Sequence, residues 1–172
     1  MAPARPLADH LAPDTTRLLQ RAAQLRFEEA RCLEAQDRLL GALYLYGYTV
    51  EMCLCAASFR AEGFPPNAPI DQDLRARRMA QARQTIGKDG KPLMDSGPHP
   101  LVGWARFLDW RRSAAGAASS AVRPSQHAVG QARKAYQHWR PGLRYKVTDV
   151  TRQQVAEVRD AASWFLKNQD RI

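Results

Sequence analysis

The sequence of this 172-residue chain predicts an all-α fold: an up-and-down bundle of four to five core helices, with a basic insertion at about 64–98 that carries a short hairpin. Three observations support the prediction. The apolar stretch Leu39–Phe59 has the length and composition of the central helix of a bundle. Apolar residues recur at spacings of three and four in the segments around it. No internal repeat of a solenoid period is present. The length fits a single domain, 1–172.

The first two helices follow from local signals in the sequence. The first begins near Pro13 or Asp14, because a proline or an acid suits the first turn of a helix, and it runs to about Ala35. Residues 1–12 are expected to be flexible. The second helix, Leu39–Phe59, is apolar on nearly all sides and ends before a Gly-Phe-Pro-Pro sequence.

The second helix is long enough to cross a bilayer, so a membrane span is the alternative to a core helix. Glu51 lies near its middle, where a carboxylate in a membrane costs several kcal/mol. The core-helix interpretation is therefore favoured, and we expect no membrane contact. The start of the chain lacks the apolar run of a signal peptide, which together with the odd number of cysteines leads us to expect a cytoplasmic protein with reduced thiols.

The remaining elements follow from local signals. Acids precede arginines in the segment 71–85, which favours a helix, and Asp89-Gly90 is typical of a tight hairpin turn. A small-residue segment at 113–125 is expected to be a mobile loop. Thr151-Arg-Gln-Gln154 is a capping box, which predicts the start of the last helix. Two further helices are expected, one from about Pro100 through Trp110 and one over Gln126–Trp139.

The net charge of +9 is concentrated in one part of the chain. Residues 75–146 hold 15 lysines and arginines against 3 acids, a balance of +12. A field of that sign concentrates phosphates and other polyanions at a surface. The alternative is that these charges are merely solvated, and composition does not decide between the two.

No metal or cofactor is expected. Cys53 and Cys55 are two residues apart on a helix and point about 200° apart, so they cannot hold one metal ion together. We interpret both as small core residues. Gly87-Lys-Asp-Gly-Lys91 lacks the first glycine and the final Ser or Thr of a phosphate-binding loop, which indicates a turn.

Glu51 is the first candidate for a functional or structural role. A carboxylate in an apolar helix must be paired, hydrogen-bonded or neutral. Arg144, in the segment before the last helix, is the partner we expect, and Glu51 would then be a buried polar anchor of the bundle. Direct participation in catalysis is the alternative.

Arg133 and His138 are the candidate acid–base pair. Histidine can transfer a proton near neutral pH and arginine can hold a phosphate, a combination that suits metal-free cleavage of RNA. The two residues are five apart, about 140° around a helix, so they are not neighbours unless the helix ends or kinks between them. The alternative is an exposed basic helix end, with Tyr136 and Trp139 packed inward.

The run from Ala42 to Ala57 has small and apolar residues before Glu51. This pattern is similar to the second-helix motif of the HEPN superfamily, and two further segments resemble elements of the same family. Gly97-Pro-His99-Pro-Leu101 resembles the element that opens the third helix, with Pro100 in place of the usual Asp. The sequence Trp139-Arg-Pro-Gly-Leu-Arg144-Tyr145 resembles the Arg-Tyr element before the last core helix, and the order and spacing of the three agree with the family.

The resemblance implies a helical bundle, commonly a homodimer, that binds nucleotides or RNA in toxin–antitoxin or phage-defence systems, often beside a nucleotidyltransferase. It also implies metal-independent ribonuclease activity in members with an Arg-x(4–6)-His motif in or next to the last part of the bundle. In this chain no histidine follows Arg144, and Arg133 to His138 lies before the Arg-Tyr element.

The leading hypothesis is therefore a non-catalytic HEPN-like module that binds RNA, a nucleotide or a partner protein such as a nucleotidyltransferase. Trp139 and Tyr145 would stack on bases. A metal-independent ribonuclease that uses Arg133 and His138 is the second hypothesis, and an antitoxin-like structural partner is the third. The residues expected at the nucleotide or RNA site are His99, Trp139, Arg140, Arg144, Tyr145 and Lys146.

Overall fold

The structure, a computed structural model, describes residues 14–97, 99–114 and 124–172. Within these ranges it is all-helical, as the sequence predicts, and contains no strand, only two isolated β-bridges. The helices are α1 (Thr16–Ala35), α2 (Leu39–Ala61), α3 (Gln72–Gln84), α4 (Leu101–Ala114), α5 (Pro124–His138) and α6 (Arg152–Asn168), with the 3-10 turn η2 (Pro141–Tyr145) before α6.

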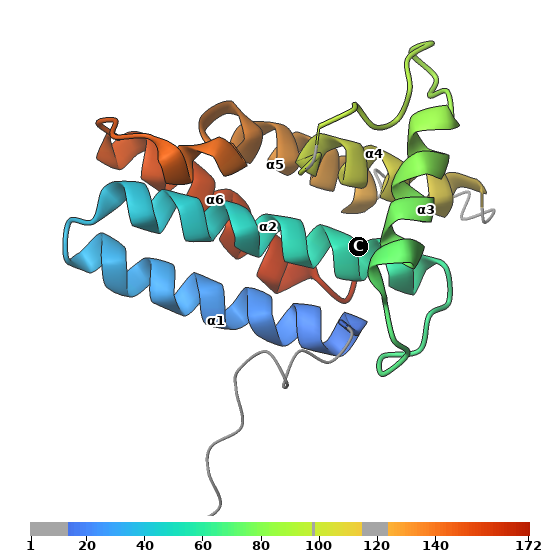
Figure 1. Cartoon of the computed structure of the whole chain (residues 1–172), viewed down its shortest axis with the longest axis horizontal. Coiled ribbons are helices and arrows are strands. Elements are labelled where there is room, and N and C mark those ends of the chain that lie inside the picture. The colour runs from blue at the N-terminus through green and yellow to red at the C-terminus, as the bar shows by residue number, and fades with distance from the viewer. Residues whose placement is uncertain (1–13, 98, 115–123) are drawn as a thin grey trace, which may run out of the picture.

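Helix α2 lies at the centre of a bundle of five core helices (Figure 1). It packs against α1, α4 and α6 and more narrowly against α5, while α4 and α5 form a second hairpin and α5 also packs on α6. Helix α3 lies outside this core and crosses the bundle next to the C-terminal end of α2 (Figure 1). The up-and-down bundle with an insertion is therefore confirmed.

The composition of α2 explains its central place. All seven consecutive residues Cys53–Phe59 are buried and together they cover every side of the helix, so several neighbours are needed to enclose it. By length and composition α2 is also the one helix among the described residues that is apolar enough to cross a membrane. Here it packs against other helices of the same chain.

Side-chain caps fix three of the helix starts. The capping box at Thr151 is present as predicted, with the hydroxyl and the Gln154 amide each bonded to a backbone N–H. Asp71 caps α3 in the same way. Helix α1 begins at Thr16, later than predicted, because the Thr15 hydroxyl accepts a hydrogen bond from the Leu18 N–H at 3.1 Å and makes Thr15 the cap.

The insertion contains α3 and the predicted turn. The Gly87 N–H donates to the Lys91 carbonyl at 2.8 Å, and Gly90 has a φ of +72°, a conformation that glycine adopts without strain. The loop predicted at 113–125 is shorter on both sides, since Ser113 belongs to α4 and Ser125 to α5. Its remainder, 115–123, and the N-terminal segment 1–12 lie outside the described residues.

Candidate anion-binding site

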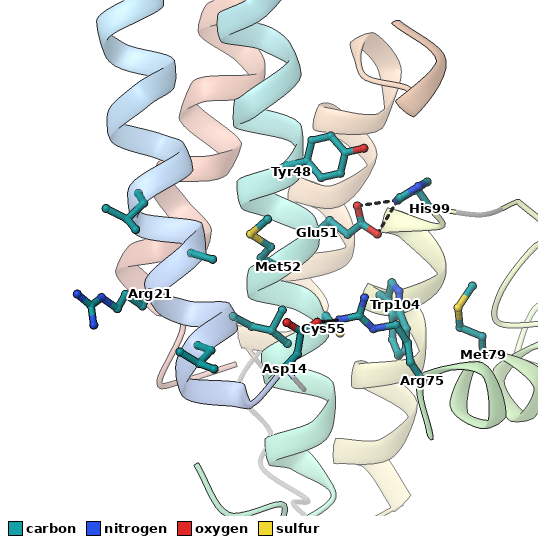
Figure 2. A pocket seen from close by; sticks show the side chains of 14 residues that line it. Asp14, Arg21, Tyr48, Glu51, Met52, Cys55, Arg75, Met79, His99 and Trp104 are labelled. Atoms are coloured by element: carbon teal, nitrogen blue, oxygen red, sulfur yellow. Dashed lines mark hydrogen bonds and ion pairs between the residues drawn. The ribbon is translucent and has the colours of Figure 1, made fainter. Parts of the chain in front are cut away.

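Glu51 is paired with His99, not with Arg144 as predicted. Nδ1 of His99 lies 2.8 and 2.9 Å from the two carboxylate oxygens, and it must donate because a carboxylate only accepts (Figure 2). The Glu51 side chain is 17% exposed and that of His99 is 30% exposed. The segment before α4 folds over the middle of α2 and supplies the partner, while the guanidinium of Arg144 lies 4.6 Å from the centre of the Tyr145 ring.

The carboxylate controls the charge of His99. Its hydrogen bond raises the pKa of His99 above the usual value, and its negative charge adds to this effect. Partial burial and the positive charges of Arg144 and Arg75 act in the opposite direction and only reduce the increase in pKa. Because Glu51 occupies Nδ1, the other ring nitrogen, Nε2, is available to a ligand, and no side chain in the described ranges hydrogen-bonds to it.

Aromatic rings surround the histidine on its inner side. The ring of Tyr48 meets the His99 ring edge-on with centroids 5.9 Å apart, and the Trp139 ring does so at 6.3 Å. The Tyr48 hydroxyl lies 3.2 Å from that of Tyr44. Burial, followed by this hydrogen bond, raises the pKa of Tyr48, so its phenol stays neutral. The imidazole is thus held in place by packing as well as by Glu51.

Trp139 is a packing residue beneath the surface of the site. The prediction that it stacks on bases is wrong. It is fully buried, so no base can reach its ring. Its indole N–H donates to the Tyr44 carbonyl at 3.0 Å, and the ring fills the space beside Gly47 of α2. An indole needs a partner for its N–H when it is buried, and this carbonyl supplies one.

A hollow of about 450 Å³ is lined in part by His99. Two arginine–tyrosine pairs line this hollow. The guanidinium of Arg140 lies 3.5 Å from the centre of the Tyr136 ring, and the guanidinium of Arg144 lies over the Tyr145 ring. Among the described residues, its lining contains no carboxylate. The lining residues are Gly97, His99, Tyr136, Arg140, Pro141, Gly142, Arg144 and Tyr145.

The structure therefore brings together four of the six residues predicted for a nucleotide or RNA site: His99, Arg140, Arg144 and Tyr145. Lys146 is exposed directly after η2 but does not line the hollow. Tyr136 is a lining residue that the prediction missed. Its spacing from Arg140 gives no helical signal, because α5 ends at His138 and the backbone of Arg140 is extended, so the two residues do not share a helix.

Arg133 and His138 are not brought together. Helix α5 continues through His138, so the two side chains leave it on different faces. Nε2 of His138 lies 2.8 Å from a carboxylate oxygen of Glu157 on α6. Arg133 lines a separate cavity of about 230 Å³ beside Trp110 and Asp109.

A third cavity, of about 580 Å³, lies between α1, α2 and α3, and His99 lines it as well (Figure 2). Its walls are mainly apolar, with Leu25, Met52 and Trp104 among them, and the Arg75–Asp14 ion pair, at 3.0 Å, lies in its lining. Cys55 lies in its floor. Burial raises the pKa of this thiol to about 12, so it is unreactive near neutral pH.

Exchange of Glu51 for glutamine is expected to lower the pKa of His99, because the neutral amide removes both the charge and the strongest hydrogen bond that favour the imidazolium. An NMR pH titration of the His99 ring measures this change. In the native protein the raised pKa stabilises the fold fully below the unfolded value of about 6.5 and loses this contribution as the pH rises through the folded value. The pH dependence of stability in this range should therefore be smaller in Glu51→Gln.

These side chains form a surface whose chemistry suits an anion. Arg140 and Arg144 supply guanidinium donors, His99 supplies an N–H fixed by Glu51, and Tyr145 is 75% exposed beside them. Donors of this kind bind phosphate groups through charge-assisted hydrogen bonds. A scan of protein-family models, a search of curated proteins and a search of solved structures found no match to this chain.

Proposed function

We propose that this chain is a non-catalytic, HEPN-like module that binds RNA or a nucleotide through phosphate contacts in the hollow beside His99. The observation that carries the proposal is the composition of that hollow. His99, Arg140 and Arg144 line it together with two tyrosines, and its described lining contains no carboxylate. Nη1 of Arg140 donates to the Trp139 carbonyl at 2.7 Å, and without competing acids the remaining guanidinium N–H groups can hold phosphate oxygens.

The charge of the surrounding chain supports the same interpretation. All residues of the hollow lie within 75–146, the part of the chain whose charge balance is +12. Such a field speeds the encounter with a polyanion and makes its binding sensitive to salt. The exposed ring of Tyr145 offers a face on which a base can stack.

The position of Arg133 and His138 favours binding over cleavage. Metal-free cleavage needs a phosphate-holding group and a proton-transferring group within reach of one phosphodiester. In this structure His138 contacts Glu157 and Arg133 faces a different cavity. The family resemblance extends the proposal to a cytoplasmic nucleic-acid conflict system, with homodimerisation and a nucleotidyltransferase or toxin–antitoxin partner.

Binding of a fluorescently labelled single-stranded RNA, followed by anisotropy over a range of salt concentrations, tests the proposal. We expect affinity to fall steeply with salt, and Arg144→Ala to weaken binding by about tenfold. The same variant should reduce the magnitude of the salt slope by about 0.7 for each phosphate that it no longer neutralises. Arg17→Ala, at an exposed arginine near the start of α1, is the matched control and should bind like the native protein.

Two results would contradict the proposal. If RNA binding is absent at low salt, or unchanged in both Arg140→Ala and Arg144→Ala, the hollow is not a phosphate site and a role as a protein partner is favoured. If the protein cleaves RNA in EDTA and His138→Ala abolishes cleavage while His127→Ala does not, the chain is a ribonuclease.

A further inference from the structure

We infer that the hollow beside His99 selects a terminal phosphate, a phosphomonoester at the end of an RNA or on a nucleotide, over an internal phosphodiester. This inference rests on the proposed function and narrows its substrate class. It follows from the number of cationic groups in the lining, from the way Glu51 holds His99, and from the charge that a ligand must bring.

The hollow offers three cationic groups to one ligand. Arg140 and Arg144 are permanently charged, and His99 is a third cation when it is protonated. An internal phosphodiester has two non-bridging oxygens and one negative charge. A terminal phosphate has three free oxygens and a charge of about −1.5 to −2 near neutral pH. Three donors with separate charges therefore suit the terminal group better.

Among the described residues, one neighbouring acid offsets part of this charge. The carboxylate that faces His99 is Glu51 of α2, and both its oxygens are bonded to Nδ1 on the inner side of the ring. The other titratable groups around the ring are the neutral phenol of Tyr48 on α2, Arg75 of α3, and Arg144 of η2. With the Glu51 charge included, the hollow keeps a net charge of about +2, which a dianion matches.

Glu51 also fixes the direction of the remaining donor. Because Nδ1 is bonded to Glu51 and the ring packs on Tyr48 and Trp139, Nε2–H cannot rotate away from its position without breaking these contacts. A donor that is already oriented loses little entropy when it binds a ligand. Glu51 is thus a positioning residue, and His99 is the residue that contacts the phosphate.

The preference for a terminal phosphate should depend on pH, because both the phosphate and His99 change their charge in this range. A phosphomonoester gains its second charge above a pKa of about 6. His99 loses its charge as the pH rises through its own pKa, which Glu51 raises. The preference for a terminal phosphate should therefore be largest between these two values and should fall on either side.

The test compares RNAs of one sequence that carry a 5′-phosphate, a 3′-phosphate or hydroxyl groups at both ends, with adenosine monophosphate, adenosine and inorganic phosphate as competitors. At about pH 6.5 we expect at least one phosphorylated RNA to bind about tenfold tighter than the hydroxyl form. The competitors distinguish the two sources of the terminal phosphate. Displacement of the RNA by adenosine monophosphate but not by adenosine indicates that the site accepts the phosphate of a nucleotide as well as that of an RNA end.

His99→Gln should reduce this preference toward equal binding, because it should weaken the binding of the phosphorylated RNA more than that of the hydroxyl-ended RNA, for which the two arginines remain. Glu51→Gln should keep part of the preference and shift its loss to lower pH. His127→Gln, at an exposed histidine of α5, is the matched control and should keep the full preference.

The outcomes separate this inference from the proposed function. If all three RNAs bind equally and Arg144→Ala still weakens binding, selection of a terminal phosphate is overturned and phosphate binding stands. If His99→Gln keeps the preference, the third donor is assigned wrongly. If no RNA or nucleotide binds, both proposals fail.

Discussion

Replacement of Gly47 by alanine is expected to destabilise the bundle by about 2–3 kcal/mol. A Cβ atom built on Gly47 would lie 2.0 Å from Cδ1 and 2.2 Å from Nε1 of Trp139. The indole cannot move aside easily, because it is fully buried and its N–H is bonded to the Tyr44 carbonyl. The helix propensity gained from alanine, about 1 kcal/mol, offsets only part of this clash. Chemical denaturation at neutral pH measures the difference.

Gly130→Ala is the matched control for this experiment. Gly130 also lies inside a helix, α5, but a Cβ atom there would meet nothing within 4 Å. The same exchange should therefore stabilise the protein by about 0.5–1 kcal/mol. Equal effects of the two substitutions, or a Gly47→Ala variant as stable as the native protein, would contradict the packing of Trp139 against α2.

The helices were predictable because their signals are local. The apolar run of α2 needs several neighbours to cover it, and the Thr151 capping box specifies a helix start within four residues. The observed end of a helix can differ from the predicted one by a few residues where a nearby side chain caps it. The Thr15 hydroxyl does so at the start of α1. Five core helices follow from such signals without knowledge of any long-range contact.

The partners within the site were not predictable in the same way. The sequence shows that Glu51 needs a partner, and both His99 and Arg144 were available to a bundle of this kind. Which one pairs depends on how the segment before α4 crosses α2, 48 residues away in the chain. No local pattern encodes that crossing. Trp139 shows the same limit, because its burial depends on the absence of a side chain at Gly47.

Trp139 links the stability of the bundle to the geometry of the hollow. Its ring contacts α2 at Gly47, meets His99 edge-on, and precedes the η2 turn that carries Arg144. A displaced indole would therefore move the histidine and the arginine relative to each other. We expect any folded Gly47→Ala protein to lose affinity for phosphate ligands as well as stability.

Replacement of Glu62 by alanine is the second change with a large expected effect, a loss of about 3 kcal/mol of stability. Glu62 caps the C-terminal end of α2, and its side chain is only 4% exposed. One oxygen accepts a hydrogen bond from Arg78 of α3, and the other lies 3.3 Å from Arg111 of α4. Its removal leaves two partly buried guanidinium groups without their counter-charge, which costs more than the pair itself contributes.

The effect should be concentrated on α3, since Ala82 is the only fully buried residue of that helix. Hydrogen exchange is expected to rise in α3 of Glu62→Ala before it rises in α2, and Glu62→Gln, which keeps an acceptor, should show a smaller loss. Asp170→Ala removes the carboxylate of another ion pair, that with Arg60, but Asp170 is 80% exposed, so that change should cost about 0–1 kcal/mol. Equal losses in Glu62→Ala and Asp170→Ala would show that the buried carboxylate does not hold α3 against the bundle.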